Sequence, residues 1–246
     1  MSAPELLNIE HLVKHHHGNV AIESAHTKYS YQQLSDQVDH RLDQLRVSGA
    51  RVVALIEPDP VKWIVWDLAL LQAGCVCVPV PPFFTLNQIR HLLQQTGADT
   101  WIGPHSDHEL LNEFGFAAGM CGWQRNVNPA AMPADTAKIT FTSGTTGTPK
   151  GVCLSASAML TVAKAMTDIT TDQSLRRYLS LLPLAVLLEN LGVWSALLSG
   201  ATVCVRNINA LSGNAADQQA VPLAIADCQA NSMILVPQLL EGLLQA

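Results

Sequence analysis

A chain of 246 residues, of which 48% are hydrophobic, is long enough for one large or two small globular domains, so disorder is excluded as its main state. The net charge is −6, from 14 basic and 20 acidic residues, and this leaves no basic field to hold a nucleic-acid backbone. The sequence contains no run of about 18 apolar residues and no secretory leader, so we expect no membrane span and a cytoplasmic protein with reduced core cysteines.

The first 27 residues are weakly patterned and contain a histidine cluster at His11 and His15–His17. No carboxylate or cysteine at ligand spacing accompanies these side chains. We therefore interpret them as part of a solvated helix or loop near a mobile terminus, and we predict no metal site.

From Ser30 onward, where Gln33 completes a capping-box pattern, apolar runs bounded by Gly and Pro predict strands that alternate with helices. Only residues 114–137 lack a clear pattern. The predicted strands are Arg51–Glu57, Cys75–Val80, Thr100–Ile102, Lys138–Phe141, Tyr178–Leu182, Thr202–Val205 and Met233–Val236. The predicted helices run from Ser30 to Gly49, over Pro60–Ala73, from Thr85 to Gly97, from Ser106, from Ser155, over Leu184–Leu198 and over Val221–Ala230.

This alternation predicts an α/β fold of parallel sheets, wound right-handed, with helices on both faces. Ligands of such folds bind at the carboxyl ends of the strands. The loop that follows Phe141 is therefore the first place to look for a site.

That loop lies within residues 138–154 and is polar and punctuated by glycines. Glycines can take positive φ and allow successive N–H groups to point into one anion-binding concavity, and we expect this of Gly144, Gly147 and Gly151. Pro149 stiffens the chain just before Lys150, which adds a positive charge. Hydroxyl donors come from Thr142, Ser143, Thr145, Thr146 and Thr148. This combination suits a polyphosphate.

Two other phosphate loops do not fit. A Walker A loop beginning at Gly144 requires glycine at 149 and Ser or Thr at 151, where the chain has Pro149 and Gly151, and the pattern G-x-G-x-x-G also fails. A plain Ser/Thr/Gly linker is compatible with the composition. However, linkers rarely lie between β-branched apolar runs and end in Pro-Lys-Gly.

From Thr142 to Gly151 the sequence matches at every position the pattern [TS]-S-G-T-T-G-x-P-K-G, and it thereby resembles the adenylate-forming superfamily of acyl-CoA synthetases, luciferase-like enzymes and peptide-synthetase adenylation domains. The resemblance extends from about Ser30 to the C-terminus. Residues 182–189 look like the L-P-L-x-H-x-x-E motif of fatty acyl-CoA synthetases, with Val186 in place of the histidine or aromatic residue that walls the carboxylate pocket in many relatives.

The resemblance implies an ATP- and Mg²⁺-dependent ligase, in which a carboxylate, here a fatty acid, attacks ATP to give an acyl-adenylate and pyrophosphate, and a thiol such as CoA then accepts the acyl group. Carried over residue by residue, the phosphate-binding residues are Thr142, Ser143, Gly144, Thr145, Thr146, Gly147 and Lys150. Glu189 is a candidate support near the nucleotide, with a charged residue on an amphipathic helix as the equal alternative.

The family's Tyr-Gly-x-Thr-Glu motif, its Gly-Asp motif and its C-terminal domain with a catalytic lysine are absent, so the catalytic residues stay unassigned. We therefore expect the N-terminal part of a longer enzyme, with a first subdomain over about 30–205, the start of a second over about 206–246, and little adenylation by these residues alone. The alternatives are a non-catalytic nucleotide- or partner-binding module derived from this family and, more weakly, an unrelated P-loop-like NTPase.

Overall fold

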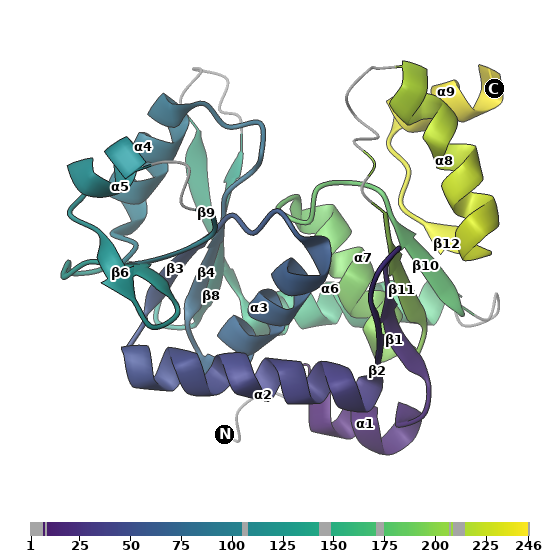
Figure 1. Ribbon diagram of the computed structural model, residues 1–246, viewed down its shortest axis with the longest axis horizontal. Coiled ribbons are helices and arrows are strands. Elements are labelled where there is room, and N and C mark those ends of the chain that lie inside the picture. The colour runs from purple at the N-terminus through teal and green to yellow at the C-terminus, as the bar shows by residue number, and fades with distance from the viewer. Residues whose placement is uncertain are drawn as a thin grey trace. The chain divides into compact units, whose positions relative to one another are not determined.

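The structure is a computed structural model that describes residues 7, 9–104, 108–142, 149–170, 175–206, 208 and 215–245. The chain forms two compact units, each a sheet covered by helices (Figure 1). The first unit contains Asp36–Met159, and the second contains Leu7–Ser35 and Leu160–Ala246.

The first unit is built on a seven-stranded sheet with the order β6-β7-β5-β3-β4-β8-β9. Its central strands β5, β3, β4 and β8 are parallel, and antiparallel strands complete both edges. The strands are β3 (Val52–Leu55), β4 (Val76–Pro79), β5 (Thr100–Ile102), β6 (Ala117–Gly119), β7 (Gly122–Gln124), β8 (Thr136–Thr142) and β9 (Lys150–Ser155).

Helix ends in this unit follow the capping chemistry of the sequence. Helix α3 (Pro60–Ala73) begins after Asp59, whose carboxylate accepts hydrogen bonds from Val61 N at 2.9 Å and Lys62 N at 3.2 Å, and it ends at Gly74 with φ of 69°. Helix α4 (Leu86–Thr96) begins with a complete capping box at Thr85. These bounds confirm the predicted ones to within a residue.

The helices of the first unit cover both faces of its sheet. Helices α4 and α5 (His108–Glu113) pack on one face over a core that includes Val78, Trp101 and Ile139, while α3 covers the other (Figure 1). Because helices cover both faces, β3 and β4 are buried on both sides, and their sequences are continuous apolar runs.

The second unit contains a five-stranded sheet with the order β12-β10-β11-β1-β2, in which only β2 is antiparallel to its neighbour. The strands are β1 (Val20–Glu23), β2 (Lys28–Ser30), β10 (Arg177–Ser180), β11 (Thr202–Val205) and β12 (Ser232–Met233). The remaining helices are α1 (Ile9–His16), α2 (Tyr31–Ser48), which begins in this unit, α6 (Ala156–Thr170), α7 (Leu187–Leu198), α8 (Ala215–Cys228) and α9 (Pro237–Gln245).

The α/β class with parallel strands and helices on both faces is confirmed, but several elements differ from the predictions. The β6–β7 hairpin lies in the segment without pattern, α1 and β1 lie in the weakly patterned first 27 residues, and β2 lies directly after them, where no strand was predicted. Helix α7 begins at Leu187 rather than Leu184, because Val186 N donates to Pro183 O in a preceding turn. The predicted start at Ser106 lies outside the described residues.

Five of the six cysteines are buried and all six are free thiols, as predicted, while Cys153 is exposed. A search of the described residues for a helix long and apolar enough to cross a membrane finds none.

Candidate functional site

The hairpin of β8 and β9 carries the two ends of the predicted phosphate loop. Thr142, the last residue of β8, lies directly opposite Lys150, the first residue of β9, and both are exposed. Because β8 runs parallel to β4, this pair lies at the carboxyl edge of the sheet, where ligands of α/β folds bind. The predicted site residues Ser143, Gly144, Thr145, Thr146 and Gly147 lie outside the described residues.

Side chains of the hairpin divide between the two faces of the sheet. Ile139 packs in the core beneath α4, whereas Lys138 contacts Asp67 of α3 on the opposite face. By the alternation of a strand, Thr142 shares the face of Lys138, and Lys150 shares it too because it lies opposite Thr142.

Gly151 has a packing role rather than the predicted conformational one. It lies in β9 and is not among the glycines of positive φ, so the expectation of positive φ at this position is wrong. A Cβ added there would lie 3.1 Å from Ile139 Cγ2 and 3.2 Å from Phe141 Cζ. A side chain at 151 would crowd these two large side chains, which would have to shift by a few tenths of an ångström to accept it.

The backbone just before Lys150 is held from the neighbouring helix. His91 of α4 donates from Nε2 to the carbonyl oxygen of Pro149 at 3.0 Å, and its ring lies edge-on to Phe141 with centroids 6.4 Å apart. This contact fixes where the chain re-enters the sheet after the loop. Sequence reasoning missed it, because nothing in the pattern of α4 distinguishes this histidine from a solvated one.

Sequence reasoning also missed a buried ion pair behind the hairpin. Lys138 Nζ lies 2.5 Å from Asp67 Oδ1, the two side chains are only 2% and 1% exposed, and the lysine also lies 5.6 Å from the ring centroid of Trp63. The available signal was a lysine in an otherwise apolar strand and an aspartate in an otherwise apolar stretch of helix. Charges at such positions need partners.

Glu189, the remaining predicted site residue, belongs to the second unit and is fully buried in the first turn of α7. Its carboxylate accepts hydrogen bonds from the Tyr178 hydroxyl at 3.0 Å and from Leu182 N at 3.3 Å. The alternative of a charged residue on the solvated face of an amphipathic helix is therefore wrong. Glu189 ties the start of α7 to β10 and to the turn between them.

Burial raises the pKa of Glu189 to about 7, although hydrogen bonds from Ser180, Tyr178 and the backbone of Leu182 oppose this rise. Tyr178 has a pKa raised by burial and by the neighbouring carboxylate, so it stays a hydrogen-bond donor. Gly192, one turn further along α7, makes room for this hydroxyl, since a Cβ there would lie 2.3 Å from it.

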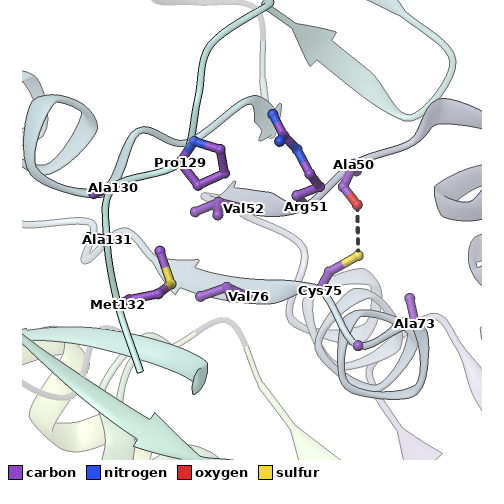
Figure 2. Close-up of a pocket in the computed structure, with 11 residues that line it drawn as sticks. Ala50, Arg51, Val52, Ala73, Cys75, Val76, Pro129, Ala130, Ala131 and Met132 are labelled. Atoms are coloured by element: carbon purple, nitrogen blue, oxygen red, sulfur yellow. Dashed lines mark hydrogen bonds between the residues drawn. The ribbon is translucent and has the colours of Figure 1, made fainter. Parts of the chain in front are cut away.

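A hollow in the first unit lies at the opposite edge of the sheet from the hairpin end (Figure 2). It has a volume of about 560 Å³ and is lined by the residues that lead into β3 and β4, together with residues 129–132. Cys75 donates from Sγ to Ala50 O at 3.2 Å, and burial raises the pKa of this thiol to about 11. A thiol held in this way is a poor nucleophile, so the hollow carries no evident chemistry.

Metal-ligating side chains do not converge in the described part of the chain. No group of three or more His, Cys, Asp or Glu side chains there could hold a metal ion. In the histidine cluster, the rings of His11 and His15 lie tilted by 56° with centroids 4.4 Å apart, and the ring of His16 lies 5.4 Å from that of Tyr31.

Comparison with solved structures identifies the fold as that of the N-terminal domain of adenylate-forming enzymes. o-Succinylbenzoate CoA synthetase from Bacillus subtilis, solved with an acyl-adenylate intermediate, has a TM-score of 0.79 at 17% identity over 96% of this chain and 63% of the synthetase. The same enzyme has also been solved with ATP and a magnesium ion. ATP-bound MatB from Rhodopseudomonas palustris has a TM-score of 0.78 at 19% identity, over 98% of this chain and 51% of MatB.

The chain belongs to the family of AMP-binding enzymes, whose sequence profile matches residues 9–246. Among curated proteins, a polyketide synthase–nonribosomal peptide synthetase, ffsA from Aspergillus flavipes, is 29% identical over 167 residues, which are 63% of this chain and 4% of that protein. The chain thus spans less than two thirds of the length of each of these relatives.

The packing at Gly151 generates a stability prediction. Gly151→Val should lower the free energy of unfolding by about 1–3 kcal/mol, because its γ carbons would overlap Ile139 and Phe141. Urea denaturation measures this effect. Val152→Ala is the matched control: its side chain is 43% exposed, and we expect a change within about 0.5 kcal/mol. Equal effects of the two changes would contradict this account of Gly151.

The buried carboxyl of Glu189 generates a pH prediction. Its pKa is about 7 in the folded chain against 4.5 for an ordinary glutamate, so the folded state binds this proton more tightly. Its stabilising contribution is complete below pH 4.5 and is lost as the pH rises to about 7, by up to about 3 kcal/mol.

Denaturation of the wild type and Glu189→Gln between pH 4.5 and 8 checks this sign, because other titrating groups cancel in the difference between the two. The wild type should lose stability relative to the variant as pH rises to 7, and the difference should then level off. A difference that is constant across this range would show that Glu189 keeps an ordinary pKa.

Proposed function

We propose that the end of the β8–β9 hairpin binds the phosphates of ATP in an acyl-adenylating ligase. The observation that carries this proposal is the pair Thr142 and Lys150, a hydroxyl and an ammonium group exposed side by side at the carboxyl edge of a parallel sheet. Ser143, Gly144, Thr145, Thr146 and Gly147 complete the proposed phosphate site.

The described residues fit a phosphate ligand better than a resident metal. Lys150 is an exposed cation, and in the described residues of the first unit no acidic side chain forms a salt bridge with it. Since the described side chains form no three-ligand cluster, Mg²⁺ would enter on the triphosphate. Bound there, it would neutralise charge on the leaving pyrophosphate.

The proposed reaction joins a carboxylic acid to AMP and then passes the acyl group to a thiol such as CoA. A fatty acid is the proposed substrate, and support comes from the motif at residues 182–189, whose turn lies between β10 and α7. Val186 in this turn makes no side-chain cap for α7 and cannot hydrogen-bond a carboxylate. This position therefore suits the apolar part of a substrate rather than its charged end.

Glu189 is proposed as a support near the nucleotide that acts through this turn, since its carboxylate accepts from the Tyr178 hydroxyl in β10 and from Leu182 N in the turn. The division into subdomains over about 30–205 and about 206–246 also stays a proposal.

Replacing Lys150 tests phosphate binding. Lys150→Ala should weaken ATP binding by about tenfold, because one charge-assisted contact is worth on the order of 1.5 kcal/mol. Isothermal titration measures the affinity. Arg46→Ala is the matched control, because Arg46 is an exposed cation of the same unit in the last turn of α2, which precedes the amino end of β3, and this variant should bind ATP like the wild type. Equal affinity for Lys150→Ala and wild type would remove the phosphate assignment.

Exchange of labelled pyrophosphate into ATP, measured on the whole protein with a panel of carboxylic acids, tests the substrate class. We expect fatty acids to stimulate exchange more than amino acids or succinylated aromatic acids do. Preference for an amino acid would overturn the fatty-acid proposal while keeping adenylation. ATP binding without exchange for any acid would favour a non-catalytic nucleotide-binding module.

A further inference from the structure

The ion pair of Lys138 and Asp67 lies where β8 joins the parallel sheet. Lys138 is the residue of β8 that lies opposite Cys77 of β4, and its side chain reaches Asp67 on the covering helix α3. The thiol of Cys77 is buried beside this pair, and burial raises its pKa, so it stays neutral. Lys138 thus makes both the backbone pairing of β8 with β4 and the buried ion pair with Asp67.

The pairing of β8 with β9 shifts at the same place. Thr136 lies opposite Ser155, but Lys138 lies opposite Leu154, so β8 contains one extra residue at Ala137. From Lys138 onward the register is regular up to the pair of Thr142 and Lys150. Such a bulge re-aims the side chains that follow it.

Without this bulge the end of the hairpin would be different. If the register at Thr136 continued unchanged, Thr142 would lie opposite Pro149 rather than Lys150. A one-residue slip also turns every side chain of a strand to the other face of the sheet. Lys138 would then point into the apolar core beneath α4, and Asp67 would lose its lysine while still buried.

We propose that the Lys138–Asp67 pair is a positioning device, which holds the bulge of β8 and thereby sets the register that places Thr142 opposite Lys150. The effect of this pair on ATP binding rests on the proposed function, whereas its effect on the register of β8 does not. Both residues are proposed to act through the register of β8 rather than on a phosphate, so both are positioning residues. Apolar side chains of similar volume can stabilise a core equally well, but they do not discriminate between registers in this way.

A disulfide reporter measures the register directly. In the observed register Thr140 lies opposite Val152, and directly opposite positions of an antiparallel pair meet the spacing that a disulfide requires. Thr140→Cys with Val152→Cys, on a Cys153→Ser background, should therefore cross-link under mild oxidation. Thr142→Cys with Pro149→Cys, on the same Cys153→Ser background, is the reciprocal reporter: Thr142 lies opposite Lys150 in the observed register and would lie opposite Pro149 only after loss of the bulge.

The decisive variant is Asp67→Leu with Lys138→Met, which removes both charges and leaves none buried alone. We expect it to fold, to lower the cross-link yield of the first reporter by about fivefold and to raise that of the second. Wild-type yields from both reporters in the folded variant would overturn the proposal. If the double variant does not fold, Asp67→Asn decides, because it keeps the volume and removes the countercharge; an unchanged yield there would equally overturn it.

ATP titration separates this inference from the proposed function. If phosphates bind at the hairpin end, the double variant should lose ATP affinity by about tenfold, as Lys150→Ala does. Loss of affinity in Lys150→Ala with unchanged register in the double variant would sink the positioning role alone. A shifted register with ATP affinity unchanged in both variants would sink the phosphate assignment and leave the positioning role standing.

Discussion

The buried ion pair of Lys138 and Asp67 restricts the register that β8 can adopt. The apolar contacts of the first unit do not impose this restriction. Apolar side chains stabilise any arrangement that removes them from water, and in a strand covered on both faces, as β8 is around Lys138 and Ile139, a slipped register can still bury them. A buried ammonium group is acceptable only where its carboxylate lies, so Lys138 and Asp67 specify one orientation of β8. The positions of Thr142 and Lys150 at the far end of the hairpin depend on that orientation.

The second unit uses a similar arrangement with different chemistry. There, Glu189 reaches from α7 to Tyr178 in β10 and to Leu182 N in the following turn, just as Asp67 reaches from α3 to Lys138 in β8. In both units a buried carboxylate on a helix fixes the strand that leads into a sequence motif. Asp67 has a cationic partner, whereas Glu189 is held by neutral donors, which explains why burial can raise the pKa of Glu189.

The sequence predicted the elements whose ends are determined by local chemistry. Asp59, Pro60 and Gly74 mark the two ends of α3 because a cap and a left-handed glycine act within one turn, and the α/β class followed from the alternation. The β6–β7 hairpin was missed, because its strands are three residues long and pair at the edge of a sheet formed by distant segments. The hydroxyl and ammonium groups of the site were found from the motif, but the partners of Lys138, Glu189 and Pro149 were not, since spacing along a chain does not reveal which helix will cover a strand.

Gly151 shows how a motif can combine two physical requirements. Within Pro-Lys-Gly, the lysine faces solvent at the end of the hairpin, while the next residue faces the side chains of Ile139 and Phe141 on the other side of the sheet. The two residues are adjacent, so the alternation of the strand sends Lys150 to the face of Thr142 and Gly151 to the face of Ile139 and Phe141. A glycine in a ligand-binding motif is therefore not evidence of unusual backbone angles. In this hairpin it leaves space for the side chains of Ile139 and Phe141 directly beside Lys150.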